Sequence, residues 1–445
     1  MKTRLLLHGL MIVAPILASA MSFPSGDPKI SIEGRFNCPY MPASGGTAYL
    51  QISITAAGRE RYARERRPMN IAVVLDRSGS MADERKMEYA KSALIKLIDQ
   101  LRSEDVFSLV VYDDVIDVVR PARRVGSDKN AIRSLVSDIY PRNSTNLGGG
   151  MIEGLQQVER NLSREYVNRV VLLSDGLANQ GITSSAELNR IARTYRKKSI
   201  SLTTMGVGLD YNENLMVGLA ESGGGNYYFI ESPSQLASIM SREFNTLSSV
   251  LVQNAAIELR LGRDVRVLDV LGCEHEARND MFTIPVGDLY ANEVRECTVE
   301  LSIPEGTGTL VAVTGSLNYE TKFGRPSQAP SFTATVQYTR DVAMVDKHRD
   351  MDVQAKADVA LSTRGVERAM KALDEGRAEE AKSELQSAKS LLYASPAAAA
   401  GGAGAAAIQE QAARLDAYNQ TLSEKDERSA KKAIQYENYR VQKKR

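Results

Sequence analysis

The spacing of hydrophobic residues changes several times along the chain, and each change predicts a different kind of structure. Between residues 69 and 248, short apolar runs alternate with segments whose apolar residues repeat at helical spacing. Residues 70–76 are typical of a strand buried on both faces, and Met87, Leu94 and Leu101 mark one face of a helix that follows. Alternating strands and helices build βαβ units, so we expect an α/β domain with a doubly wound, mostly parallel sheet.

A period of two replaces this pattern on both sides of the α/β segment. In residues 28–58, Leu50, Ile52 and Ile54 alternate with polar residues and share one face of a predicted strand. Residues 252–340 show the same alternation with little helical spacing between the runs. We therefore predict one antiparallel β-sandwich domain, split in sequence by the inserted α/β domain. A separate N-terminal hairpin is the alternative.

Helical spacing returns in the last quarter of the chain. Residues 341–394 predict a helical hairpin of tetratricopeptide-like character, because Leu385 and Leu392 repeat at helical spacing after a glycine turn. The alanine- and glycine-rich residues 395–407 predict a flexible linker. Residues 408–445 predict a basic helical tail, for which we prefer a solvated state over contact with a membrane surface or an acidic partner.

The first 20 residues have the pattern of a secretory signal peptide. They combine a basic start, a short apolar run and a small-residue end. We expect an exported protein, either periplasmic or secreted, with an uncleaved membrane anchor as the alternative. The net charge of the 445 residues is +1 at pH 7, a balance that argues against nucleic-acid binding.

Three cysteines occur in the sequence. In an oxidising compartment, we predict a disulfide between Cys273 and Cys297, which leaves Cys38 unpaired. Three unpaired thiols are the alternative, because spacing alone does not decide the pairing. None of the three cysteines has the spacing of metal ligands.

Oxygen-bearing side chains gather where two of the predicted strands end. Asp76, Ser78 and Ser80 follow one buried strand at alternate positions, and Asp175 ends another. Thr145 lies in a loop rich in glycine and asparagine. Carboxylate and hydroxyl oxygens suit hard cations such as Mg²⁺, Ca²⁺ or Mn²⁺ rather than zinc. If the strands are neighbours, these side chains can meet at the carboxyl edge of the sheet.

The segment DRSGSM at residues 76–81 resembles the signature of the von Willebrand factor type A domain and its metal-ion-dependent adhesion site. The resemblance extends over residues 70–247 and includes the segment SDGLANQG. It implies that a divalent cation, for which we expect Mg²⁺, contacts Ser78, Ser80 and Thr145 directly. It further implies that Asp76 and Asp175 bind the ion largely through water. An acidic residue of a protein partner would fill the open coordination position.

Two other classes of function compete with this metal-dependent binding module. A serine nucleophile would need a base, and the three histidines, His8, His275 and His348, all lie outside the α/β segment. A phosphate-binding loop with its lysine is also absent from the sequence. We therefore do not expect an enzyme. A structural subunit of an envelope assembly, in which the ion mainly orders the loops, remains the alternative.

Overall fold

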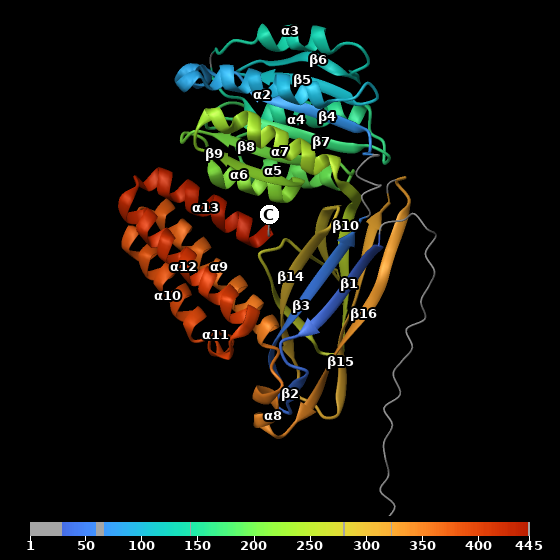
Figure 1. The fold of residues 1–445 in the computed structure, drawn as a ribbon, viewed down its shortest axis with the longest axis vertical. Helices are drawn as coiled ribbons and strands as arrows, with labels where there is room; N and C mark the ends of the chain where they lie inside the picture. Colours follow the sequence, from blue (N-terminus) through green and yellow to red (C-terminus); the bar gives the residue numbers. More distant parts are fainter. Residues whose placement is uncertain (1–28, 59–65, 143, 279–280, 322, 444–445) are drawn as a thin grey trace, which may run out of the picture.

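The computed structural model describes residues 29–58, 66–142, 144–278, 281–321 and 323–443. Three parts are visible: an α/β domain, a β-domain and a group of C-terminal helices (Figure 1). The predicted signal segment, residues 1–20, lies outside the described residues. Among the helices that are described, none combines the length and the apolar character that crossing a membrane requires.

The α/β domain is built on a six-stranded sheet with the order β6-β5-β4-β7-β8-β9. Five strands are parallel and β6 pairs antiparallel with β5, so the predicted mostly parallel sheet is confirmed. The strands are β4 (Met69–Asp76), β5 (Val106–Tyr112), β6 (Ile116–Arg124), β7 (Val167–Ser174), β8 (Ser201–Val207) and β9 (Gly224–Ile230).

Helices cover both faces of this sheet. Ile71 and Val73 of β4 face the core beneath α2, α3 and α7, whereas Ala72 and Val74 face the core beneath α4, α5 and α6. This burial on both faces explains why β4 is apolar without alternation. The helices are α2 (Lys86–Gln100), α3 (Lys129–Ser137), α4 (Leu147–Arg160), α5 (Ser185–Arg196), α6 (Glu213–Gly223) and α7 (Leu236–Ser248), and the 3₁₀ segments are η1 (Gly79–Arg85) and η2 (Pro233–Gln235).

The β-domain contains two sheets, and both include strands that precede the α/β domain. The first has the order β1-β3-β14-β11 and the second β12-β13-β10-β15-β16-β2. Ile52 of β3 pairs with Cys297 of β14, although the α/β domain lies between these two strands in the sequence. The strands are β1 (Lys29–Phe36), β2 (Tyr40–Pro42), β3 (Gly46–Ala57), β10 (Val250–Leu261), β11 (Arg266–Leu271), β12 (Glu276–Arg278), β13 (Met281–Tyr290), β14 (Glu293–Ile303), β15 (Thr309–Glu320) and β16 (Pro326–Thr339).

Residues of the two sheets share one hydrophobic core. At one close approach, a Cβ atom added to Gly34 of β1 would lie 2.1 Å from the ring of Phe332 in β16. The domain departs from the purely antiparallel prediction in one strand, because β2 pairs parallel with β16. The chain passes from β1 in the first sheet to this three-residue strand in the second sheet.

The C-terminal region is helical, as predicted, but residues 395–407 are not the predicted flexible linker. They form α11 (Pro396–Ala400) and the start of α12 (Gly402–Glu424), with Gly401 between them at a φ of +75°. Alanine has the highest helix propensity, and the Ser395 side chain caps α11 by accepting a hydrogen bond from the backbone N–H of Ala397. The remaining helices are α8 (Val342–Lys347), α9 (Met351–Asp374), α10 (Ala378–Tyr393) and α13 (Glu427–Lys443).

The expected solvated tail is also wrong, because α13 packs against the α/β domain. It lies between the other C-terminal helices and the α/β domain (Figure 1). Tyr436 and Tyr439 stack edge-on against Tyr227 of β9, with ring centroids 5.8 and 5.7 Å apart. The backbone N–H of Tyr227 donates to the Tyr439 hydroxyl at 3.2 Å. These contacts between tyrosine rings anchor α13 on β9, although the overall composition of α13 is strongly polar.

Candidate metal centre

The candidate site lies at the carboxyl edge of the parallel sheet. Strands β4 and β7 are hydrogen-bonded neighbours, with Leu75 opposite Leu173. Asp76 is the last residue of β4, and Asp175 directly follows the last residue of β7. The parallel register therefore brings the two carboxylates to the same place, as the strand pattern predicts.

Asp76 is fully buried and is surrounded by hydrogen-bond donors. Its Oδ1 accepts from the backbone N–H of Ser78 at 2.8 Å. Its Oδ2 accepts from the Ser174 hydroxyl at 2.7 Å and from the Tyr112 hydroxyl at 3.3 Å. Burial raises the pKa of Asp76 to about 6, although the hydrogen bonds from Ser78 and Ser174 oppose this effect. The carboxylate is consequently held in one orientation at the base of the site.

A chain of short contacts connects the two serines to Asp175. The hydroxyl oxygens of Ser78 and Ser80 lie 3.1 Å apart. The Ser80 hydroxyl donates to Asp175 Oδ1 at 2.8 Å, and Lys86 Nζ donates to Asp175 Oδ2 at 2.9 Å. Asp175 and Lys86 are both buried, so this ion pair is an internal feature of the site.

Thr145 enters the site from a loop that is pinned by its backbone. Its N–H donates to Asn179 Oδ1 at 3.0 Å, and its carbonyl accepts from the N–H of Asn179 at 3.2 Å. A Cβ atom added to Gly176 would lie 3.3 Å from Thr145 Oγ1 and 3.8 Å from Ser80 Oγ. The two hydroxyls therefore border the same space beside Gly176, and all five predicted residues come together.

Asp113 supports this arrangement from behind. Because Asp113 follows a predicted strand, the sequence predicts that it lies in a solvated turn. In the structure, however, the Asp113 side chain is fully buried. Its carboxylate accepts hydrogen bonds from Arg77 and Arg142, and its carbonyl accepts from the N–H of Asn146 at 2.7 Å. Burial would raise the pKa of Asp113, but these arginines and the N–H of Val115 lower it. Asp113 thereby ties the loop after β4 to the Thr145 loop.

The donor atoms fit a hard divalent cation. Three hydroxyls and two carboxylates meet here, and such oxygens are the ligands that Mg²⁺ prefers in proteins. In the part of the chain that the structure describes, no group of three or more histidines, cysteines, aspartates or glutamates is placed to hold a metal. An ion at this site would thus depend on hydroxyl oxygens as much as on carboxylates.

Four residues of the site were not predicted from the sequence: Ser174, Tyr112, Asn179 and Lys86. Ser174 and Tyr112 end strands β7 and β5, so their position at the ends of buried runs is a signal that could have found them. Lys86 gives no such signal, because it opens α2 and reaches Asp175 only through the tertiary fold. It places a positive charge beside the proposed ion.

The predicted disulfide is not present, because all three cysteines are free thiols. Cys273 and Cys297 nevertheless face each other, and their thiols are hydrogen-bonded. The fold therefore brings together the two cysteines that the sequence predicts to pair, and a bond between them stays a prediction. The Cys38 thiol lies elsewhere and donates to the carbonyl of Val345 at 3.2 Å.

The α/β domain carries hydroxyl and carboxylate side chains at the carboxyl edge of its sheet, and these features together indicate the class of this domain. Residues 70–242 match the family described as von Willebrand factor type A domain. The chain therefore contains a von Willebrand factor type A domain, set between the two sequence segments of a β-domain.

Comparison with known proteins extends the similarity beyond this domain. The chain is 27% identical to the Escherichia coli protein YfbK over 239 residues, which are 54% of this chain and 41% of YfbK, so the match spans less than half of that relative. A solved von Willebrand factor type A structure from Catenulispora acidiphila has a TM-score of 0.74 at 18% identity, covering 95% of this chain and 98% of that one.

The ArnB paralog VWA2 from Sulfolobus acidocaldarius has a TM-score of 0.62, also at 18% identity, and the match covers 93% of this chain and 98% of that one. At this level of identity the two solved structures show a shared fold. Because both matches span nearly the whole chain, the shared fold includes the β-domain and the C-terminal helices.

Proposed function

We propose that this protein is a metal-dependent binding module whose cation recognises an acidic residue of a protein partner. Ser78, Ser80 and Thr145 would supply hydroxyl oxygens to the ion, and Asp76 and Asp175 would hold it largely through water. The observation that carries the proposal is the meeting of three hydroxyls and two buried carboxylates at one edge of the sheet. This meeting supports the proposal of a metal-ion-dependent adhesion site.

The charges of the site favour an acidic ligand. Asp76 and Asp175 contribute two negative charges, and Lys86 neutralises one of them at 2.9 Å. A bound divalent cation would leave the site with a net positive charge. In a partly buried environment, such a charge attracts a carboxylate more strongly than it would in water. Mg²⁺ is the expected ion, with Ca²⁺ and Mn²⁺ as alternatives.

We further propose that the protein acts outside the cytoplasm, in the periplasm or after secretion. This proposal rests on the signal-peptide pattern of residues 1–20. We do not extend it to a membrane contact through the C-terminal tail. Lys431 and Lys432 of α13 are engaged in ion pairs with Glu213, so these charges face the protein rather than a separate surface.

The first test is whether the site binds metal. Calorimetric titration of Mg²⁺ and of Mn²⁺ should give a binding heat with the wild type and none with Asp76→Ala. Asp99→Ala is the matched control, because Asp99 is an exposed aspartate that pairs with Arg133 on the surface. This control should bind both ions as the wild type does. Equal heats from the wild type and Asp76→Ala would contradict the proposed metal site.

The second test concerns the partner. Envelope extract should be passed over immobilised wild type and Asp76→Ala, each with Mg²⁺ and with a chelator. We expect a protein retained only by the wild type with Mg²⁺, and replacing an acidic residue of that protein should abolish its retention. Metal binding without any metal-dependent partner would instead favour the structural role, in which the ion orders the loops.

A further inference from the structure

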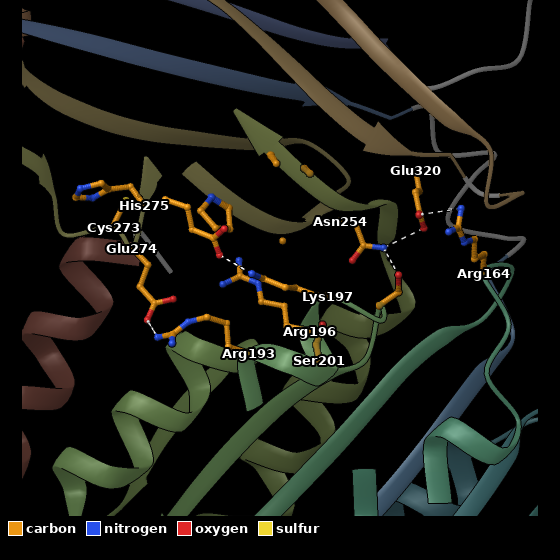
Figure 2. Close-up of a pocket in the computed structure, with 16 residues that line it drawn as sticks. Arg164, Arg193, Arg196, Lys197, Ser201, Asn254, Cys273, Glu274, His275 and Glu320 are labelled. Carbon is orange, nitrogen blue, oxygen red and sulfur yellow. Dashed lines mark hydrogen bonds and ion pairs between the residues drawn. The ribbon is translucent and has the colours of Figure 1, made fainter. Parts of the chain in front are cut away.

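A cavity of about 640 Å³ lies between the α/β domain and the β-domain. Figure 2 shows its lining, with the end of α5 on one side and strands of the β-domain on the other. Ser201, the first residue of β8, borders the cavity. The cavity therefore lies at the amino end of the parallel strands, whereas the proposed metal centre lies at their carboxyl end.

Three ion pairs line this cavity, and each joins a cation of the α/β domain to a glutamate of the β-domain (Figure 2). These pairs are Arg193–Glu274 at 2.9 Å, Lys197–Glu276 at 2.8 Å and Arg164–Glu320 at 3.5 Å. They balance three positive charges against three negative ones, and each connects the two sides of the cavity.

Arg196 is the fourth cation of the lining, and it differs from the other three. Its Nη1 donates to the carbonyl of Glu221 at 3.1 Å, but within the described residues its guanidinium forms no ion pair. The nearby carboxylates are already engaged, Glu274 by Arg193 and Asp288 by Arg169. Burial lowers the pKa of Arg196, although the charges of Glu274 and Asp288 act to raise it.

Arg196 is half-buried, and because the nearby carboxylates are held by other arginines, an anion that enters the cavity can pair with its guanidinium. Arg196 lies close to two glycines that leave it room. A Cβ atom added to Gly224 would lie 2.7 Å from its Nε, and one added to Gly287 would lie 3.8 Å from its Nη2.

The rest of the lining combines small apolar groups with polar ones. Ala255, Ala256 and Pro285 form an apolar part, beside the polar side chains of Ser201 and His275. A volume of this size is within the range of small-molecule sites, which are typically apolar with a few polar groups that orient the ligand.

Asn254 borders the cavity in an unusual backbone conformation. Its φ is +53°, and the pairing of β10 with β15 shifts in register between Gln253 and Ala256. The Asn254 side chain donates to the Ser199 hydroxyl at 2.6 Å and to Glu320 at 2.9 Å, which fixes this bulge against the α/β domain (Figure 2). β-bulges are frequent next to binding sites, where they redirect side chains.

We propose that this cavity is a binding site for a monoanionic carboxylate with an apolar body, and that Arg196 pairs with the carboxylate group. One unbalanced positive charge in the lining matches one negative charge on the ligand. A guanidinium presents two N–H groups in the geometry that a carboxylate accepts. The alanine and proline part of the lining would accommodate the apolar body. Phosphate esters fit less well, because their second charge would face three glutamates.

The carboxylate can come from a small organic acid or from the C-terminus of a peptide, and the probes separate these sources. Thermal unfolding and calorimetric titration would use benzoate, inorganic phosphate, and one short apolar peptide with either a free or an amidated C-terminus. All titrations contain a chelator, so that a carboxylate held by a cation at the other site gives no signal. A response to benzoate alone identifies a small acid, and a response to the free-acid peptide but not to its amide identifies a peptide terminus.

We expect at least one carboxylate probe to raise the melting temperature of the wild type more than phosphate does. Arg196→Gln should weaken binding of that probe by roughly tenfold or more. Arg196→Lys, which keeps the charge but not the fork of two donors, should bind with intermediate affinity. Arg190→Gln is the matched control, because Arg190 is an exposed residue of the same helix.

The Arg190→Gln control should bind the probe as the wild type does. Absence of a response to every carboxylate probe, or equal binding by Arg196→Gln and the wild type, would overturn the proposal. The Asp76→Ala variant should keep its response to the probes, so a failure of this site is distinguishable from a failure of the metal centre.

Discussion

At the scale of single residues, Lys86 sets the charge of the proposed metal centre. It follows Glu84 and Arg85, whose φ values of +50° and +58° place them in the left-handed region that such residues rarely adopt. This turn starts α2 at a position from which Lys86 reaches Asp175. Burial acts to lower the pKa of Lys86, but the hydrogen bond and charge of Asp175 raise it. Lys86 is therefore a permanent cation within the site.

Replacing this cation should have opposite effects on stability and on metal affinity. In Lys86→Met, Asp175 keeps its buried charge without a positively charged partner, so the free energy of unfolding in chelator should fall by about 3 kcal/mol. Mg²⁺ should bind roughly tenfold more tightly, because a repelling charge has been removed. Urea denaturation and calorimetry measure the two effects. Lys96→Met, an exposed change on the same helix, should alter neither, and weaker Mg²⁺ binding by Lys86→Met would contradict this role.

At the scale of secondary structure, α13 joins the C-terminal helices to the α/β domain. It covers β9, the last strand of the sheet, and edge strands left open invite pairing with other chains. Lys431 and Lys432 pair with Glu213 of α6, and Lys432 Nζ lies 3.9 Å from the centre of the Tyr211 ring. Burial would raise the pKa of Glu213, but the hydrogen bonds and charges of the two lysines lower it.

The docking of α13 should consequently weaken in acid. Because the pKa of Glu213 is lower in the folded protein than in the unfolded chain, its contribution is present above the ordinary value of 4.5 and is lost as pH falls below it. Hydrogen-exchange protection of α13, corrected for the intrinsic rate, should decrease between neutral pH and about pH 4. Glu213→Gln should show reduced protection already at neutral pH and a smaller change with pH. The exposed Glu437→Gln should behave as the wild type; equal pH dependence in Glu213→Gln would contradict the assignment.

At the scale of the whole molecule, the α/β domain and the β-domain are joined by buried contacts. Arg169 of β7 is 0% exposed and pairs with Asp288 of β13 at 2.8 Å. Val250 and Tyr290, from β10 and β13, complete the hydrophobic core beneath α7. The chain also crosses between the domains twice, before β4 and after α7. We therefore expect the two domains to unfold together rather than independently.

A single substitution at this junction should test that cooperativity. Asp288→Asn leaves the charge of Arg169 buried, so the free energy of unfolding should fall by about 3 kcal/mol while unfolding stays a single transition. Circular dichroism and tyrosine fluorescence report on the same event, since the chain has no tryptophan. Asp264→Asn, in an exposed turn, should leave stability unchanged. Two separate transitions, or equal stability of the two variants, would show that the domains are independent.

Much of this architecture follows from local sequence patterns. A strand such as β4 that is buried on both faces is recognisable because residues 71–75 are all apolar, and the order of strands and helices then predicts a parallel sheet. Parallel strands end at one edge, so the sequence predicts that Asp76 and Asp175 lie at the same edge, and the pairing of β4 with β7 in the structure brings them together. The shared period-two pattern predicts that residues 28–58 and 252–340 form one β-domain, and the structure shows that β3 pairs with β14 within it. These inferences succeed because periodicity and strand direction are local properties of the chain.

The tertiary structure alone decided the features that depend on contacts between distant segments. Lys86 meets Asp175 across 89 residues, and Tyr439 meets Tyr227 across 212. Residues 396–400 form a helix although their composition predicts a linker, because a run of alanines does not itself show what packs against it. Arg196 looks like any other basic residue of a helix until the β-domain closes over it. Charge and hydrogen-bonding capacity are visible in a sequence, but their energetic consequences depend on burial and partners, which only the folded chain defines.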